Sequence, residues 1–152
     1  MEIKVYSIDK KGKNSLYNPL IEHYKKISKP FAKIETIDIF NNKIAKAQES
    51  SSLLAKQEYT KALEPFLNGY TVVLDPNAKE VDSLEFAQIF NKGIKVTFFI
   101  GGAYGFEKEF IKRANLSISF GKITMSHKLI KVVLMEQIYR GLTIVNNHPY
   151  HK

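Results

Sequence analysis

The end of the chain gathers side chains that can exchange protons. His148, Tyr150 and His151 lie within the final five residues, beside the rigid Pro149. Chain ends usually fray, but this concentration of hydrogen-bonding groups predicts a tail that docks. Imidazole and phenol groups serve as general acids and bases, so an acid–base role or an RNA contact is the functional interpretation. An inert tail is the alternative, and two histidines without a nearby carboxylate argue against a metal site.

A run of glycines forms a second candidate site. Gly101, Gly102 and Gly105 follow directly after the apolar run 96–100, with the spacing GGxxG. Glycine lets backbone approach a ligand closely, and ligands of open α/β sheets bind beyond the carboxyl ends of the strands. The spacing differs from GxGxxG, and no acidic residue follows about 20 positions later to hold a ribose, so a dinucleotide site is weakly supported. A tight structural turn without a ligand stays open as the alternative.

Two more segments are expected beside these glycines. Residues 121–126 lie between a short apolar run and the last helical segment, and Leu74, Asp75 and Pro76 end another apolar run. The carboxyl ends of parallel strands meet at one edge of a sheet, so the three loops can converge on one pocket. No GKS or GKT sequence occurs, which argues against a P-loop. The pocket would suit a cofactor recognised largely by backbone groups.

An alternation of apolar runs and helical periods positions these loops. The runs predict strands at 2–8, 33–39, 70–74, 96–100 and 116–120. Segments of helical period predict helices at 15–27, 45–67, 82–91, 107–114 and 126–142, and Asp82 with Glu85 resembles a capping box at the start of the third. The order predicts a single α/β domain over residues 1–152, with a mostly parallel sheet flanked by helices.

The last predicted helix is apolar on almost every side. A helix of this kind must be covered on almost every side, whereas a helix that flanks a sheet keeps one face in water. A second copy of the chain is the simplest cover, which predicts a homodimer; complete burial within one monomer is the alternative. Glu136 and Arg140 lie four residues apart on this helix, and we expect the pair to face the partner or a site.

Composition limits the classes of protein further. The chain has 152 residues, with 23 Lys plus Arg against 15 Asp plus Glu, and no Cys, which excludes disulfides, thiolate metal sites and cysteine nucleophiles. The net charge of +8 favours a polyanionic partner such as nucleic acid, although the preference for Lys over Arg also fits codon bias and a solvated surface. No stretch reaches the ~20 apolar residues of a membrane span, so a cytoplasmic protein is expected.

The segment from His127 to Arg140 (HKLIKVVLMEQIYR) and the closing PYHK at 149–152 closely resemble the ribosomal RNA large subunit methyltransferase H family. The IGGxxG run at 100–105 and Val73-Leu74-Asp75 match that family in order and spacing, and the resemblance covers the whole chain. It implies a SPOUT-class methyltransferase with a C-terminal trefoil knot, working as a homodimer. It also implies that S-adenosylmethionine is used to methylate N3 of a pseudouridine in helix 69 of large-subunit (23S) ribosomal RNA, on the ribosome.

The resemblance assigns roles to particular residues and requires no metal. For cofactor binding it implies Leu74, Gly102, Gly121, Lys122, Ile123, Thr124, Met125 and Ser126. It implies that the tail, through His148, Tyr150 and His151, completes the active site of the partner subunit. On chemical grounds we expect His151 or Tyr150 near the N3 proton and Arg140 as the orienting or anion-stabilising cation.

The sequence departs from the family at two positions. Ser126 stands where the family commonly has Pro, which is expected to loosen the cofactor loop, and Lys131 stands where it commonly has Arg, which loses bidentate phosphate recognition. For ribosomal RNA we expect contacts from lysines whose binding weakens steeply with salt: Lys10, Lys11, Lys13 and Lys25.

Two other functional classes stay open at this point. A non-catalytic RNA-binding or ribosome-associated module would bind RNA but lack a saturable cofactor site. A nucleotide-binding oxidoreductase of flavodoxin-like fold would carry a coloured or dinucleotide cofactor.

Overall fold

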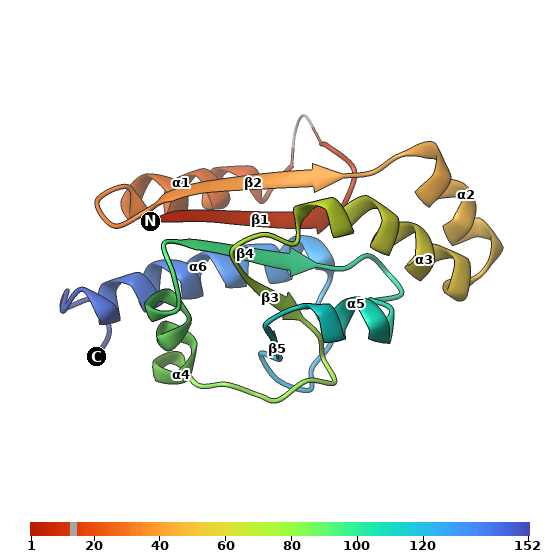
Figure 1. The fold of residues 1–152 in the computed structure, drawn as a ribbon. Helices are drawn as coiled ribbons and strands as arrows, with labels where there is room; N and C mark the ends of the chain where they lie inside the picture. The colour runs from red at the N-terminus through yellow and green to blue at the C-terminus, as the bar shows by residue number, and fades with distance from the viewer. Residues whose placement is uncertain (13–14) are drawn as a thin grey trace.

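A parallel sheet organises the computed structural model, which describes residues 1–12 and 15–152. The five strands run in the order β2-β1-β4-β3-β5, and every neighbouring pair is parallel. Their bounds are β1 (Glu2–Ile8), β2 (Lys33–Ile39), β3 (Tyr70–Leu74), β4 (Lys95–Ile100) and β5 (Leu116–Ile118). The predicted α/β class with a parallel sheet is therefore confirmed (Figure 1).

Helices cover both faces of this sheet. They are α1 (Asn18–Ser28), α2 (Asn42–Ser50), α3 (Ser52–Leu63), α4 (Ser83–Ala87), α5 (Lys108–Arg113) and α6 (His127–Val145), with 3-10 turns η1 (Glu64–Phe66) and η2 (Gln88–Asn91). The predicted capping box opens α4, since Asp82 and Glu85 each accept a hydrogen bond from the other's backbone N–H. The fifth predicted strand is shorter than expected, because it ends at Ile118.

The prediction of one long helix over 45–67 is wrong, because the helix is interrupted at Ser51. This residue is extended, with φ −159° and ψ 158°, and its side chain accepts a hydrogen bond from the backbone N–H of Leu54. A serine that caps in this way ends one helix and begins the next. Further on, α3 ends at Leu63 and Pro65 falls in the 3-10 turn η1.

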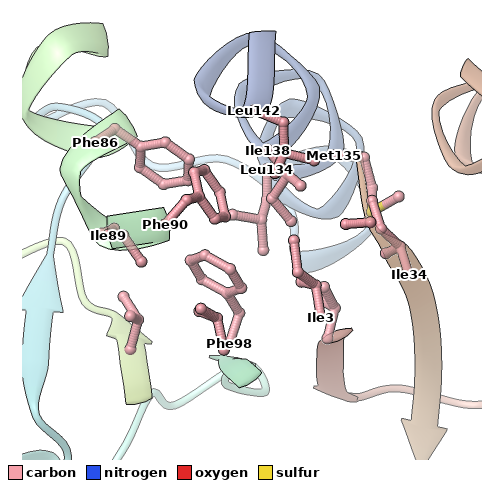
Figure 2. Close-up of a cluster of buried hydrophobic side chains, with 14 of the residues drawn as sticks. Ile3, Ile34, Phe86, Ile89, Phe90, Phe98, Leu134, Met135, Ile138 and Leu142 are labelled. Carbon is pink, nitrogen blue, oxygen red and sulfur yellow. The ribbon is translucent and has the colours of Figure 1, made fainter. Parts of the chain in front are cut away.

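Alternate residues of the strands fill two apolar cores. One lies between the sheet and α1, α4, η2 and α6, and it is built around Phe86, Phe98, Leu134 and Ile138 (Figure 2). The other lies between the sheet and α2, α3 and α5, where Tyr59, Phe99 and Phe110 are fully buried. Among the described residues, no helix is long and apolar enough to cross a membrane.

Candidate active site

A pocket of about 760 Å³ lies where the carboxyl ends of β3, β4 and β5 meet. Its wall combines residues 74–77 after β3, residues 100–106 after β4, and residues 118–121 with 123–127 after β5. The three loops that the sequence singled out therefore converge on one pocket. Of the cofactor-binding residues expected from the resemblance, those that line it are Leu74, Gly102, Gly121, Ile123, Thr124, Met125 and Ser126; Lys122 is exposed and does not.

Local backbone geometry explains two of the glycines in this wall. Gly105 has φ +77° and closes a turn by donating its N–H to the carbonyl oxygen of Gly102 over 3.1 Å. Gly121 has φ +126° and exchanges hydrogen bonds with the Ser119 side chain. Side chains with a Cβ rarely adopt these conformations, so glycine avoids backbone strain at both positions.

The wall of the pocket indicates what kind of ligand it suits. Apolar residues line much of it, and the glycine loops lie beside polar residues that include Asp75, Thr124 and Ser126. Lys56 and Lys108, which the sequence analysis did not single out, also line the pocket and supply positive charge. The volume lies within the range of small-molecule sites, roughly 300–1,000 Å³. This arrangement suits a ligand with an aromatic base and an anionic group.

The start of α6 is fixed beside this pocket by a buried carboxylate. Asp9, only 6% exposed, follows β1; its oxygens lie 2.9 Å and 3.1 Å from Lys128 Nζ, and one lies 3.2 Å from His127 Nε2. Burial opposes ionisation of Asp9, but its hydrogen bond to Lys128 and the charges of His127, Lys128 and Lys131 bring its pKa below the ordinary value. Ser126 caps the helix by accepting the N–H of Leu129 over 3.3 Å, a contact that proline could not make.

Lys131 does not lie where a phosphate could reach it. Its side chain is 6% exposed and donates to a carboxylate oxygen of Asp38, with an Asp9 oxygen 3.8 Å away. The interpretation of this position as a phosphate contact is therefore wrong for this chain: its partners are carboxylates at the ends of β1 and β2.

The tail docks, as predicted, and in this structure it does so against the far part of α6 of the same chain. There Glu136 accepts hydrogen bonds from Arg140 Nη2 over 2.6 Å and from Tyr150 Oη over 3.1 Å. Arg140 also lies over the Tyr150 ring, 4.7 Å from its centroid, and its Nη1 lies 3.3 Å from Nδ1 of His151. We call Glu136, Arg140, Tyr150 and His151 the tail cluster.

His148 lies apart from the tail cluster. Its backbone N–H donates to the carbonyl oxygen of Thr143, and its ring meets Phe31 edge-on at 5.9 Å. The structure therefore brings three of the four predicted catalytic residues together: Arg140, Tyr150 and His151. Sequence reasoning treated Glu136 only as the ion-pair partner of Arg140, because nothing in the sequence reveals that the tail docks against it.

The charges of the tail cluster affect its two candidate proton acceptors, Tyr150 and His151, differently. Burial and the hydrogen bond to Glu136 raise the pKa of the Tyr150 phenol, so it stays protonated at neutral pH. The hydrogen bond to Glu136 also raises the pKa of Arg140, which keeps its guanidinium charged. A guanidinium only donates, so a hydrogen bond between Arg140 and His151 can run only from Arg140 to Nδ1.

The pocket lies beside the first residues of α6, whereas the tail cluster lies further along the same helix. The pocket contacts the helix up to Ile130, whereas the tail cluster is centred on Arg140, ten residues later. At the rise of an α-helix this separation is about 15 Å along the axis. With the tail docked in this way, no residue of the tail cluster lines the pocket of the same chain.

The lysines expected to hold RNA differ in their surroundings. Lys10 lies over the ring of Phe40 at 5.1 Å, Lys11 is exposed, and Lys25 pairs with Glu22 over 2.8 Å. Lys13 lies outside the described residues. Within residues 1–12 and 15–152, no group of three or more His, Asp or Glu side chains is placed to hold a metal ion.

Comparisons with known proteins extend over the whole fold. A family described as "Predicted SPOUT methyltransferase" matches residues 1–151. A protein of Sulfurovum sp. named "Ribosomal RNA large subunit methyltransferase H" is 62% identical, and one of the same name from Campylobacter lari is 47% identical, with 100% of both chains covered in each case. The crystal structure of a tRNA (m1G37) methyltransferase from Aquifex aeolicus matches with a TM-score of 0.53 at 14% identity, covering 100% of this chain and 75% of that one. That last likeness concerns the fold alone.

Proposed function

The chain belongs to the SPOUT methyltransferase family, and within it to the ribosomal RNA large subunit methyltransferase H family, and from this membership we propose that it methylates large-subunit ribosomal RNA with S-adenosylmethionine. The observation that carries the proposal is the pocket formed by the three strand-end loops. The finer target, N3 of a pseudouridine in helix 69, is what the resemblance implies. The C-terminal trefoil knot stays a prediction of the same resemblance, and the cytoplasmic location stays a prediction from the sequence.

The residues of the pocket fit S-adenosylmethionine. Leu74 and Ile118 offer an apolar wall for an adenine ring, while the backbone of the glycine loops offers donors and acceptors to its edges. Lys56 and Lys108 can pair with the carboxylate of the methionine portion. A Cβ on Gly102 would lie 2.6 Å from Tyr59 behind it, so the loop follows this course only with glycine there.

We further propose that the working enzyme is a homodimer in which the tail of one copy serves the pocket of the other. Two observations support it: the separation of about 15 Å between pocket and tail cluster within one chain, and the uncovered apolar side chains of α6. Leu129 is 41% exposed and Val133 is partly exposed, on the same side of the helix as Glu136 and Arg140. A second copy covering this face would meet the tail cluster as well.

The proposed methylation requires the protein to position the pseudouridine base and to remove the proton from its N3. When bound, S-adenosylmethionine supplies a methyl group already activated on a sulfonium. N3 of pseudouridine carries a proton and lies between two carbonyl groups. We propose that an N–H of Arg140 exchanges its hydrogen bond to His151 for one to a carbonyl oxygen of the base, which stabilises the imide anion. Nδ1 of His151 is then free to accept the N3 proton. The raised pKa of Tyr150 favours His151 over Tyr150 as the acceptor.

Calorimetry with S-adenosylmethionine, followed by methyl transfer to ribosomes with and without the pseudouridine, tests the proposal. We expect saturable binding of S-adenosylmethionine, and methyl transfer only to ribosomes that contain the pseudouridine. Gly102→Ala should abolish binding, because its Cβ would displace the loop, whereas the matched Gly93→Ala should leave binding unchanged, since its Cβ meets other atoms at 3.8 Å. If the wild-type protein binds no S-adenosylmethionine, the proposed activity is refuted. Equal methyl transfer to ribosomes that carry uridine in place of the pseudouridine would refute only the pseudouridine target.

A further inference from the structure

A buried phenol lies behind the glycine loop of the pocket. Tyr59 belongs to α3 and is fully buried, and it does not line the pocket. Its hydroxyl donates a hydrogen bond to the side-chain oxygen of Gln48 on α2. Burial raises the pKa of Tyr59, so the hydroxyl keeps the proton that it donates. The helix pair α2–α3 is thus joined by a hydrogen bond at the point where it meets the loop.

The same pair of residues contacts the loop from its rear side. The position that a Cβ would occupy on Gly102 lies 2.6 Å from both Cζ and Oη of Tyr59, so the loop backbone rests directly on the end of this side chain. Tyr104, two residues further along the loop, donates its hydroxyl to the backbone carbonyl oxygen of Gln48 over 3.4 Å. The front of the loop, residues 101–106, forms the pocket wall.

We propose that Tyr59, held by Gln48, is a positioning residue that sets the course of the cofactor-facing loop. The residue acts through the backbone of residues 102–104 and touches no part of the ligand. This inference rests on the proposed function, because it gives the loop behind the pocket a part in binding S-adenosylmethionine. It assigns a binding role to the break at Ser51 as well, since the break lets α2 fold back and bring Gln48 to Tyr59.

Tyr59→Phe removes the hydroxyl and keeps the ring in the core. We expect affinity for S-adenosylmethionine, measured by calorimetry, to fall roughly fivefold to tenfold, the effect of one lost buried hydrogen bond. The KM for the cofactor should rise in parallel, while the KM for ribosomes stays unchanged. The matched control is Tyr6→Phe: Tyr6 is 6% exposed and packs in the same core, but no hydrogen bond of its hydroxyl reaches the loop. We expect wild-type affinity from this control.

Amide hydrogen exchange in the free protein provides a readout that needs no cofactor. In Tyr59→Phe, exchange at Ala103 and Tyr104 should accelerate relative to Tyr6→Phe, while the central strands keep their protection. Unchanged exchange and affinity in Tyr59→Phe would overturn the inference even where the wild type binds cofactor normally. Faster exchange at these amides in a protein that binds no S-adenosylmethionine would refute the proposed function and leave the role of Tyr59 in the loop standing.

A second variant guards against misfolding of the first. Gln48 is half-buried near the surface, so Gln48→Ala removes the acceptor without opening the core. It should accelerate exchange at the same two amides and weaken cofactor binding in the same direction. Wild-type behaviour of a folded Gln48→Ala would contradict the proposed coupling between α2 and the loop.

Discussion

At the scale of single residues, Arg140 connects the parts of the tail cluster. Its guanidinium donates to Glu136, lies over the Tyr150 ring and faces Nδ1 of His151. One planar group therefore contacts the other three side chains of the cluster. Arg113, the other arginine of the sequence, makes an exposed pair with Glu64 over 2.9 Å. The two arginines therefore offer a matched comparison between a candidate catalytic group and a surface ion pair.

Arg140→Lys should lower methyl transfer roughly a hundredfold, because an ammonium keeps the charge but cannot form the fork or stack in the same way. Affinity for S-adenosylmethionine should not change, because no residue of the tail cluster lines the pocket. Single-turnover transfer and calorimetry measure the two quantities. Arg113→Lys is the control and should transfer at the wild-type rate; an equal loss in both variants would contradict the role of Arg140.

Asp9 offers a second residue-scale prediction, on stability against pH. Its folded-state pKa lies below the unfolded value of about 3.9, so its contribution is complete above that pH and is lost as pH falls through the folded value. Asp9→Asn should lower the free energy of unfolding at pH 7 by about 1.5–3 kcal/mol. The variant should also lose less stability than the wild type on acidification below about pH 4.

Urea unfolding between pH 3 and pH 7 measures both effects of Asp9→Asn. Asp82→Asn serves as the control, because asparagine caps a helix about as well as aspartate and the change in stability should be small. Identical acid dependence in wild type and Asp9→Asn would show that Lys128 and His127 do not stabilise the ionised carboxylate.

At the scale of elements, α6 carries both parts of the site and leaves one face uncovered. The pocket lies at its start, the tail cluster near its end, and Leu129 and Val133 lie exposed or partly exposed between them. The remaining apolar residues of the helix pack on the core that faces α1 and α4. The sequence pattern predicted a helix covered on almost every side, and the chain itself covers all but this face.

Leu129→Glu should weaken the proposed dimer by placing a charge in its apolar contact. Sedimentation velocity should find a larger monomer fraction than for the wild type at equal concentration. The control is Leu53→Glu on α3, a leucine that is 62% exposed on a helix of the opposite sheet face from α6, and it should sediment as the wild type does. A wild type that sediments as a monomer would remove the dimer from the proposal.

Strands and strand-end loops could be predicted from the sequence because their signals are local. The apolar runs ending at Leu74 and Ile100 mark β3 and β4, and the loops after them had to meet at one edge. The break at Ser51 lies in a run of three serines, Ser50 to Ser52, which is a capping signal that the prediction of one long helix passed over. The sequence alone still does not reveal which of the three serines is extended. The partnership of Glu136 with Tyr150 depends on how the tail docks, which no periodicity encodes.

At the scale of the whole molecule, the proposed enzyme is complete only as a pair of chains. Each chain holds one pocket and one tail cluster, at opposite ends of α6. In a two-fold dimer the same face of both copies meets, so whatever one tail supplies to its partner it also receives. The charge of +8 per chain doubles in such a pair and favours a polyanionic substrate.

Complementation between two inactive chains tests this division. One chain carries Gly102→Ala with an intact tail, and the other lacks residues 147–152 with an intact pocket. Neither should transfer methyl groups alone, whereas after mixing and exchange about a quarter of wild-type activity should appear, because half of the dimers are mixed and each holds one intact pair.

The control mixes the tail-deleted chain with a chain that carries both lesions, and no activity should return. Native mass spectrometry confirms that mixed dimers form. Mixed dimers without activity would mean that each tail serves its own pocket.

The distance between the two ends of α6 also has a kinetic consequence. If the parts of the site meet only between copies, a newly synthesised chain is inert until it encounters a second one. Below the dissociation constant of the pair, the initial rate should then rise with the square of protein concentration, and above it in direct proportion. The amount of enzyme that a cell makes would thus set a threshold for modification of its ribosomes.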